Sequence, residues 1–82
     1  MSAVTLTRIE AGKNMRRFYR LDVQPTLFGE YALVREWGRI GRGGQVRSTP
    51  YPTAEAATAA FELQLSTKAR RGYEPTFPKI GL

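Results

Sequence analysis

The sequence predicts an α+β fold in which a single antiparallel β-sheet of four or five strands packs against one α-helix. Residues 4 to 48 form short segments of alternating apolar and polar side chains separated by glycine or proline, the pattern of strands and tight turns. Residues 53 to 71 instead have apolar side chains at helical spacing. The length of 82 residues predicts one domain, 1–82, with its core at about 4–74 and a tail at 75–82.

Four strands are predicted in the first part of the chain. They comprise residues 4–9, 16–24, 31–37 and 45–48. Turns are expected at Ala11–Asn14 and at Gly43-Gly44, where glycine would supply the positive φ of a hairpin turn. Pro50 and Pro52 are expected to end sheet pairing, because proline has no backbone N–H. The third strand carries apolar side chains on both faces, which leaves open the face that meets a ligand.

One helix is predicted from Thr53 to about Arg71. Thr53 is a suitable N-cap, and Gly72 is suited to ending the helix. The stripe expected to lie on the sheet consists of Ala54, Ala57, Phe61 and Leu65. Leu63 points away from that stripe. The segment that follows, 73–82, contains two prolines and is predicted to form no regular element.

The composition excludes most kinds of catalytic and metal site. The chain has no histidine and no cysteine, so it cannot build a Cys/His zinc site, a disulfide, or a Ser-His-Asp or Cys-His nucleophile. Its seven acidic residues are scattered and form no paired-carboxylate signature. We therefore predict a non-catalytic protein that uses no metal and no cofactor.

The charge indicates an anionic partner. The net charge is +6, and nine of the 13 Lys and Arg residues lie in the first fifty positions. Eight of these nine are Arg, which forms forked contacts with phosphate. No apolar stretch is long enough to span a bilayer, and the first residues lack the pattern of a secretory signal. We therefore expect a cytoplasmic monomer with no membrane contact.

The end of the third strand contains a distinctive motif, Trp-Gly-Arg-Ile-Gly at 37–41, followed by Gly-Gln at 44–45. Asn14 precedes a strand that includes Arg17-Phe18-Tyr19, and Gly72-Tyr73 closes the predicted helix. With these segments in this order, the chain resembles the WGR domain family, named for that tripeptide. The resemblance extends from about residue 4 to residue 74.

The resemblance implies an antiparallel sheet with one helix and a role in binding DNA. In poly(ADP-ribose) polymerases, the WGR domain contacts DNA at breaks and relays that contact to neighbouring domains. No ADP-ribosyltransferase segment is recognised in this sequence, so we expect a free-standing WGR domain. Neither that activity nor an NAD site is carried over.

The WGR motif supplies the first candidate binding residues. The resemblance implies that Trp37 stacks on a sugar or base at a DNA end, whereas the alternative is a half-buried core tryptophan. Gly38 would bring backbone N–H groups close to phosphate or simply form a twisted turn. Arg39 would grip a phosphate, although the matching arginine of the polymerases contacts a neighbouring domain. Three more arginines flank this loop and would form a phosphate-tracking patch or remain solvated: Arg35, Arg42 and Arg47.

A second candidate group surrounds the second strand. The resemblance implies that Asn14 lies near the DNA end, although asparagine also suits a turn because it tolerates the left-handed conformation. Arg17 and Arg20 are candidates for phosphate contacts, but they are three residues apart and can lie on opposite strand faces. The cations of the last helical turn are interpreted mainly as complementing the helix dipole: Lys68, Arg70 and Arg71.

Two function classes follow from these residues. The favoured one is a DNA-binding module whose affinity is mainly electrostatic and weakly sequence-specific, with RNA as a variant that the sequence does not separate. The alternative is a protein-interaction module that docks on an acidic partner, with Arg39 and Leu63 as candidate contacts. Loss of DNA binding on mutation of Trp37 would discriminate between them.

Overall fold

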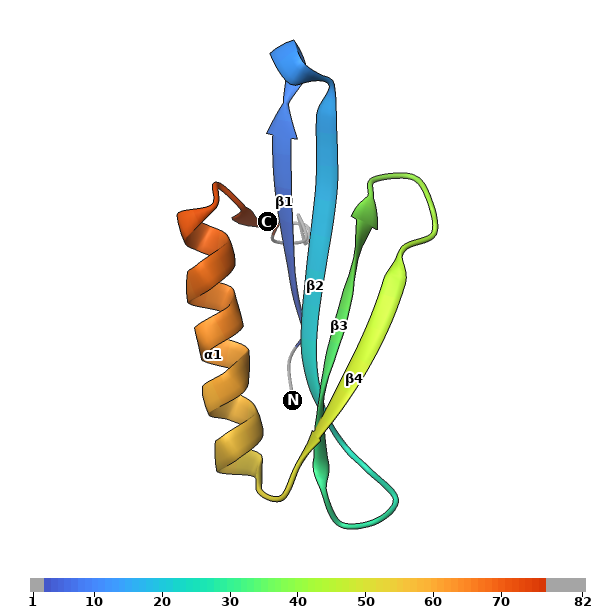
Figure 1. Ribbon diagram of the computed structural model, residues 1–82, viewed down its shortest axis with the longest axis vertical. Coiled ribbons are helices and arrows are strands. Elements are labelled where there is room, and N and C mark those ends of the chain that lie inside the picture. The colour runs from blue at the N-terminus through green and yellow to red at the C-terminus, as the bar shows by residue number, and fades with distance from the viewer. Residues whose placement is uncertain (1–2, 77–82) are drawn as a thin grey trace, which may run out of the picture.

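The computed structural model describes residues 3–76 and confirms the predicted α+β fold (Figure 1). A five-stranded antiparallel sheet has the strand order β4-β3-β2-β1-β5, and one helix lies along one of its faces. In chain order, the elements are β1 (Val4–Glu10), the short 3-10 helix η1 (Ala11–Lys13), β2 (Met15–Pro25), β3 (Tyr31–Arg39), β4 (Gln45–Tyr51), α1 (Ala54–Arg70) and β5 (Glu74–Thr76).

The core lies between the sheet and α1. Alternation along the strands directs one set of side chains toward the helix, and the most buried of these are Leu6, Leu21 and Leu33. Ala57 of α1 is fully buried against them, and Phe61 and Leu65 pack beside it as the predicted stripe requires. The opposite face of the sheet carries no helix in the part of the chain that the structure describes.

Local sequence signals fix both ends of α1. The Thr53 hydroxyl accepts a hydrogen bond from the Ala56 backbone N–H at 3.1 Å, which is the predicted N-cap. At the other end, Gly72 adopts a φ of 91°. The backbone N–H groups of Gly72 and Tyr73 donate to the carbonyls of Ala69 and Lys68, both at 3.1 Å. This is a Schellman motif, which reverses the chain back toward the sheet.

Two predictions that rested on proline are wrong. β4 continues past Ser48 to Tyr51, with Pro50 paired opposite Ala32. Residues 74–76, placed in the irregular tail, form β5 and pair with β1, with Pro75 opposite Leu6. Both strands are sheet edges, where a residue without an N–H is tolerated because one side of the strand has no neighbour. The rest of the predicted tail, 77–82, lies outside the described residues.

The β3–β4 connection also differs from its prediction. Positive φ occurs at Gly41 (88°) and not at Gly43-Gly44. The Arg42 backbone N–H donates to the Arg39 carbonyl at 3.1 Å, so residues 39–42 form a type II turn with Gly41 at its third position. Gly44 is required for a different reason, since a Cβ there would collide with the carbonyl oxygen of Trp37.

Candidate nucleic-acid interface

A pocket of about 550 Å³ lies between the sheet and the C-terminal end of α1. Its aromatic lining is formed by Tyr19, Trp37 and Tyr73, and its cationic lining by Arg17, Arg35, Arg39 and Lys68, with the strand residues Phe18 and Gly38 completing the wall. None of the described residues that line it is acidic. We call this cavity the α1–sheet pocket.

Strand register brings the sheet residues of the pocket together. Tyr19 of β2 lies directly opposite Trp37 of β3, and Arg17 lies opposite Arg39 one step further along. Residues two apart on a strand point to the same face, so all four side chains lie on the face that α1 covers. The helix ends before the strands do, which leaves this part of the face open (Figure 1).

Trp37 is half-buried in the structure, which is the alternative to DNA stacking considered for it from the sequence. Its ring stacks against Tyr19 with centroids 6.1 Å apart and an angle of 20° between the planes, and it packs against the core. It also lines the α1–sheet pocket. One part of the indole therefore supports the fold while another part is accessible to a ligand.

The Schellman motif positions Tyr73. Because the chain reverses at Gly72, the Tyr73 ring lies 6.3 Å from that of Tyr19, centroid to centroid, at 70° to it. Tyr73 thereby forms a wall of the pocket that faces the sheet from the helix end. A local backbone conformation dictated by one glycine thus builds part of the site.

Lys68 is held against the two tyrosines. Its Nζ lies 4.4 Å from the centre of the Tyr19 ring and 5.8 Å from that of Tyr73, within range of cation–π attraction. Burial lowers the pKa of Lys68 below its usual value, and the charges of Arg71 and Arg35 lower it further. An anion in the pocket would stabilise the charged form of this lysine.

Arg35 has an unsatisfied donor. Its Nε is buried and has no hydrogen-bond partner among the described residues. The ion pairs within residues 3–76 lie elsewhere, between Arg8 and Glu10 at 3.3 Å and between Arg20 and Asp22 at 3.9 Å. The four cations of the pocket therefore face one another without a described carboxylate, an arrangement that favours a bound anion.

Comparison with known proteins agrees with the motif. The model of the WGR domain family matches residues 2–79. This chain belongs to the WGR domain family. WGR domains are commonly nucleic-acid-binding modules.

One curated relative of this WGR domain is the uncharacterized protein y4dW of Sinorhizobium fredii. The two are 40% identical over 68 residues, which cover 83% of this chain and 33% of that protein. The chain thus spans about a third of the length of the curated relative that it matches. No solved structure matches the chain.

The structure brings together five of the predicted binding residues of the WGR domain. Those that line the α1–sheet pocket are Arg17, Arg35, Trp37, Gly38 and Arg39. Arg47 lies beside them in register with Arg35, but it is exposed and does not line the pocket. Arg42 is exposed in the loop beyond β3.

The other two predicted residues lie apart from the pocket. Asn14 is at the tip of the β1–β2 hairpin with a φ of 52°, the left-handed turn conformation considered as its alternative role. Arg20 lies on the opposite face of the sheet from Trp37 and pairs with Asp22 at 3.9 Å. Arg17 and Arg20 therefore cannot act on one ligand surface.

Four pocket residues of the WGR domain were not predicted as binding residues. Phe18, Tyr19 and Tyr73 were noted only as parts of the family motif, and Lys68 was interpreted as complementing the helix dipole. Gly72 was a signal for Tyr73. In a Schellman motif, the residue after the glycine frequently contacts the last turns of the helix. The long separation of Tyr19 from Lys68 gave no comparable local signal.

No helix among the described residues is both long and apolar enough to cross a membrane. Within residues 3–76, no three acidic, histidine or cysteine side chains are grouped in a way that could hold a metal ion.

Proposed function

We propose that this WGR domain is a non-catalytic DNA-binding module that prefers DNA ends or breaks. The observation that carries the proposal is the α1–sheet pocket, which combines a partly accessible Trp37 with four cations and no described acid. Aromatic rings supply stacking surfaces for bases, and the arginines supply contacts to phosphate.

The preference for ends follows from where an aromatic ring can stack. Inside a duplex, both faces of each base are covered by neighbouring bases, so Trp37 has no free face to contact. An end or a break exposes one such face. The exposed Arg17 and Arg39 at the pocket are suited to the backbone phosphates beside it, and Arg42 and Arg47 extend the cationic surface.

The pocket favours nucleic acid over the alternative partner, an acidic protein. An acidic peptide would satisfy the cations but would not need several aromatic rings around them. Arg39 belongs to this pocket, whereas the other candidate protein contact, Leu63, is exposed on α1 and does not line it. Competition between labelled DNA and poly-glutamate separates the two functions, since a protein module would bind poly-glutamate at least as well.

The first test is fluorescence anisotropy with blunt, nicked and closed-hairpin DNA and with a duplex RNA of the same sequence, across a salt series. Trp37→Ala should weaken binding to open ends by about 5- to 150-fold, the equivalent of about 1–3 kcal/mol for one stacked base. Log affinity should fall with log salt by about 0.9 for each phosphate contacted. Circular dichroism checks that the variant is folded.

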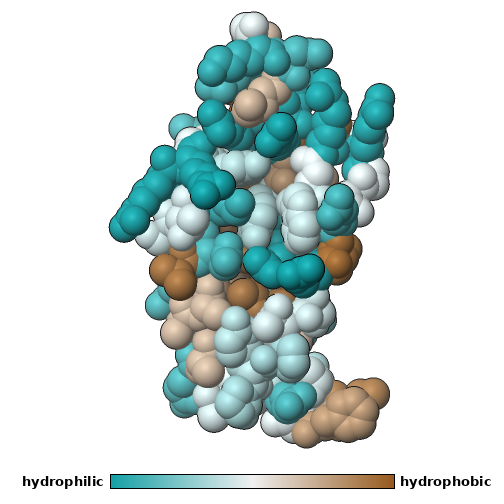
Figure 2. Space-filling model, in the orientation of Figure 1, coloured by the Kyte–Doolittle hydropathy of each residue, from teal (hydrophilic) through white to brown (hydrophobic). Residues whose placement is uncertain are grey.

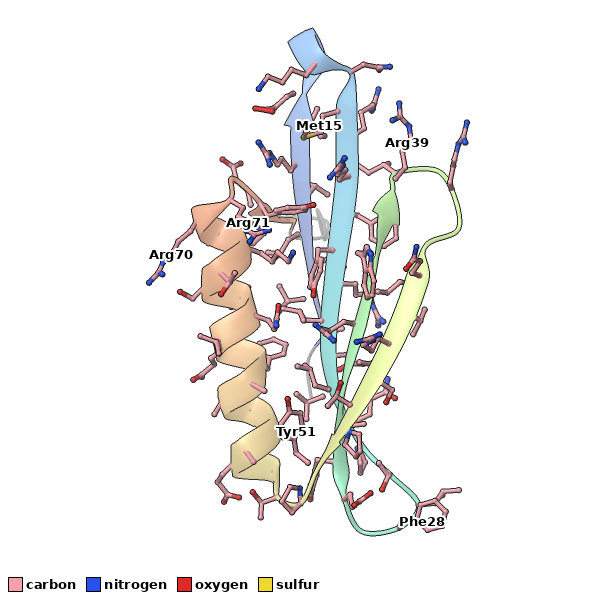
Figure 3. All side chains as sticks on the ribbon, viewed as in Figure 1. Met15, Phe28, Arg39, Tyr51, Arg70 and Arg71 are labelled. Atoms are coloured by element: carbon pink, nitrogen blue, oxygen red, sulfur yellow. The ribbon has the colours of Figure 1, made fainter. Side chains whose placement is uncertain are left out.

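Phe28→Ala is the matched control, because Phe28 is an exposed aromatic residue in the β2–β3 turn, away from the pocket (Figure 3). It should leave DNA binding unchanged. Equal weak binding to all substrates, unaffected by Trp37→Ala, would overturn the proposal and leave only a generic attraction to polyanions.

A further inference from the structure

We propose that the α1–sheet pocket receives a single unpaired nucleotide at a DNA end, so that the preferred ligand is an end with a short single-stranded overhang. This inference rests on the proposed function and specifies which form of DNA end the site takes. It is carried by the size of the pocket, by the arrangement of its rings, and by the difference between its inner and outer cations.

The pocket has the size of a site for one small molecule. Its volume of about 550 Å³ lies within the range of about 300–1,000 Å³ that encloses ligands of drug size, and one nucleotide is of that size. The sheet bounds it on one side, and the end of α1 with Tyr73 bounds it on the other. An intact terminal base pair carries a second base and a second backbone, so it is larger than a ligand of that size.

The rings leave room for one base. Tyr19 is engaged on all sides, because it stacks on Trp37, its ring holds Lys68, and its hydroxyl donates to the Gln64 side chain at 3.4 Å. Trp37 and Tyr73 line the pocket from the sheet and from the helix end. A base that enters would stack on Trp37 and meet Tyr73 at its edge.

The cations form an inner and an outer pair. Arg35 and Lys68 are half-buried, whereas Arg17 and Arg39 are exposed. The outer pair can contact the phosphates of any duplex that approaches. The inner pair is reached only by a backbone that enters the pocket, where its phosphate would give the buried Arg35 Nε the partner that it lacks.

Lys68 should respond most to such a ligand. Its pKa is lowered by burial and by two neighbouring arginines, and the negative charge of an entering phosphate would raise it. Arg39, in contrast, is exposed at the rim of the pocket. The two residues therefore distinguish entry into the pocket from contact at its rim.

Base pairing sets the expected preference. A blunt end must unpair its last base pair before a nucleotide can enter, whereas an overhang already presents one. We therefore expect duplexes with an overhang of one or two nucleotides to bind about 10- to 100-fold more tightly than the blunt duplex.

The test uses one duplex in three forms: blunt, with a single unpaired 2-aminopurine at the end, and closed by hairpin loops. The unpaired 2-aminopurine should lose fluorescence on binding, because it stacks on Trp37, and this form should bind most tightly. Lys68→Met should weaken binding to the overhang form by a larger factor than binding to the blunt form, so that the preference for the overhang falls. Arg39→Ala should instead weaken binding to blunt and overhang forms by the same factor.

Arg70→Met is the control for Lys68→Met, because Arg70 is an exposed cation on the same helical turn that points away from the sheet (Figure 3). It should preserve the preference for the overhang. Equal affinity for blunt and overhang ends, with Trp37 still required, would overturn this inference and leave the proposed function intact. Absence of Trp37-dependent binding to any of the three forms would overturn both.

Discussion

The two ends of this WGR domain differ in charge although they are built from the same strands. The α1–sheet pocket is lined by four cations, and the upper part of the molecule in Figure 2 is mostly hydrophilic. At the other end, residues 21–34 and 48–67 contain four acidic side chains and no Lys or Arg. Charge is thus separated along the strands, so that a polyanion is attracted to one end and repelled from the other.

The second end exposes apolar side chains instead. In the β2–β3 turn, Leu27 is 98% and Phe28 is 88% exposed, and Phe28 points away from the body of the protein (Figure 3). The turn is nevertheless ordered by Thr26, whose hydroxyl accepts from the backbone N–H groups of Phe28 at 3.2 Å and Glu30 at 3.1 Å. Both ends of the protein therefore expose aromatic surface. The α1–sheet pocket differs from the β2–β3 turn because its aromatic rings lie beside cations that have no described acidic partner.

The largest expected effect on DNA binding comes from reversing the charge at the cationic end. Arg17→Glu combined with Arg39→Glu should weaken DNA binding by at least about 100-fold, because each charge-assisted contact contributes about 1.5–3 kcal/mol. The slope of log affinity against log salt should also fall by about 0.9 for each phosphate lost. Anisotropy titrations across a salt series measure both quantities.

Charge reversal at the other end is the matched control. Glu30→Lys combined with Glu55→Lys makes the net charge more positive but lies outside the pocket, so it should leave the preference for open ends unchanged. If this pair altered that preference as strongly as the arginine pair, the binding surface would not be confined to the cationic end.

A smaller effect is expected from a pair of glycines. Gly72, beside the pocket, and Gly29, in the β2–β3 turn, have φ values of 91° and 81°. Alanine at either position should lower the free energy of unfolding by roughly 1–2 kcal/mol, because a Cβ is strained in this region. Only Gly72→Ala should also weaken DNA binding, since it disturbs the turn that positions Tyr73. Urea unfolding and anisotropy together test this, and equal loss of DNA binding by both variants would contradict it.

The smallest effect concerns the stability associated with Lys68. Because its pKa is lowered in the folded protein, folding disfavours the charged lysine; this penalty is fully present below the folded-state pKa and disappears as pH rises toward the usual value of 10.5. Lys68→Met should therefore raise the melting temperature at pH 7, and the difference from the unmodified protein should shrink as pH approaches 10.5. Arg70→Met should show neither effect in the same thermal melts.

Local sequence signals predicted much of the fold. The four N-terminal strands, the N-cap at Thr53 and the end of the helix at Gly72 depend on interactions between residues close in the chain. The two proline-based predictions failed because they treated proline as a local property. Whether a missing N–H matters depends on whether the strand is at an edge, and that depends on strands far away in the sequence.

The residues of the candidate site also fall into two groups, those indicated by the sequence and those decided by the packing of α1 on the sheet. The WGR motif indicated Trp37, Gly38 and Arg39 without any structure, and the absence of histidine and cysteine restricted the chemistry. The sequence did not determine which sheet face α1 covers, because β3 carries apolar residues on both. That choice places Arg17 in the pocket and Arg20 outside it.

Composition, the WGR motif and the helix caps are therefore what the sequence determined by itself, since each depends on residue types or on short spacing. Tertiary structure alone decided that Tyr19, Lys68 and Tyr73 share one pocket with Trp37. These residues come from β2, from the last turn of α1 and from the segment after it, and they meet only because the helix packs on the sheet and reverses there. The burial of apolar side chains drives that packing, and it leaves the cations of three elements facing one another with no described acid between them.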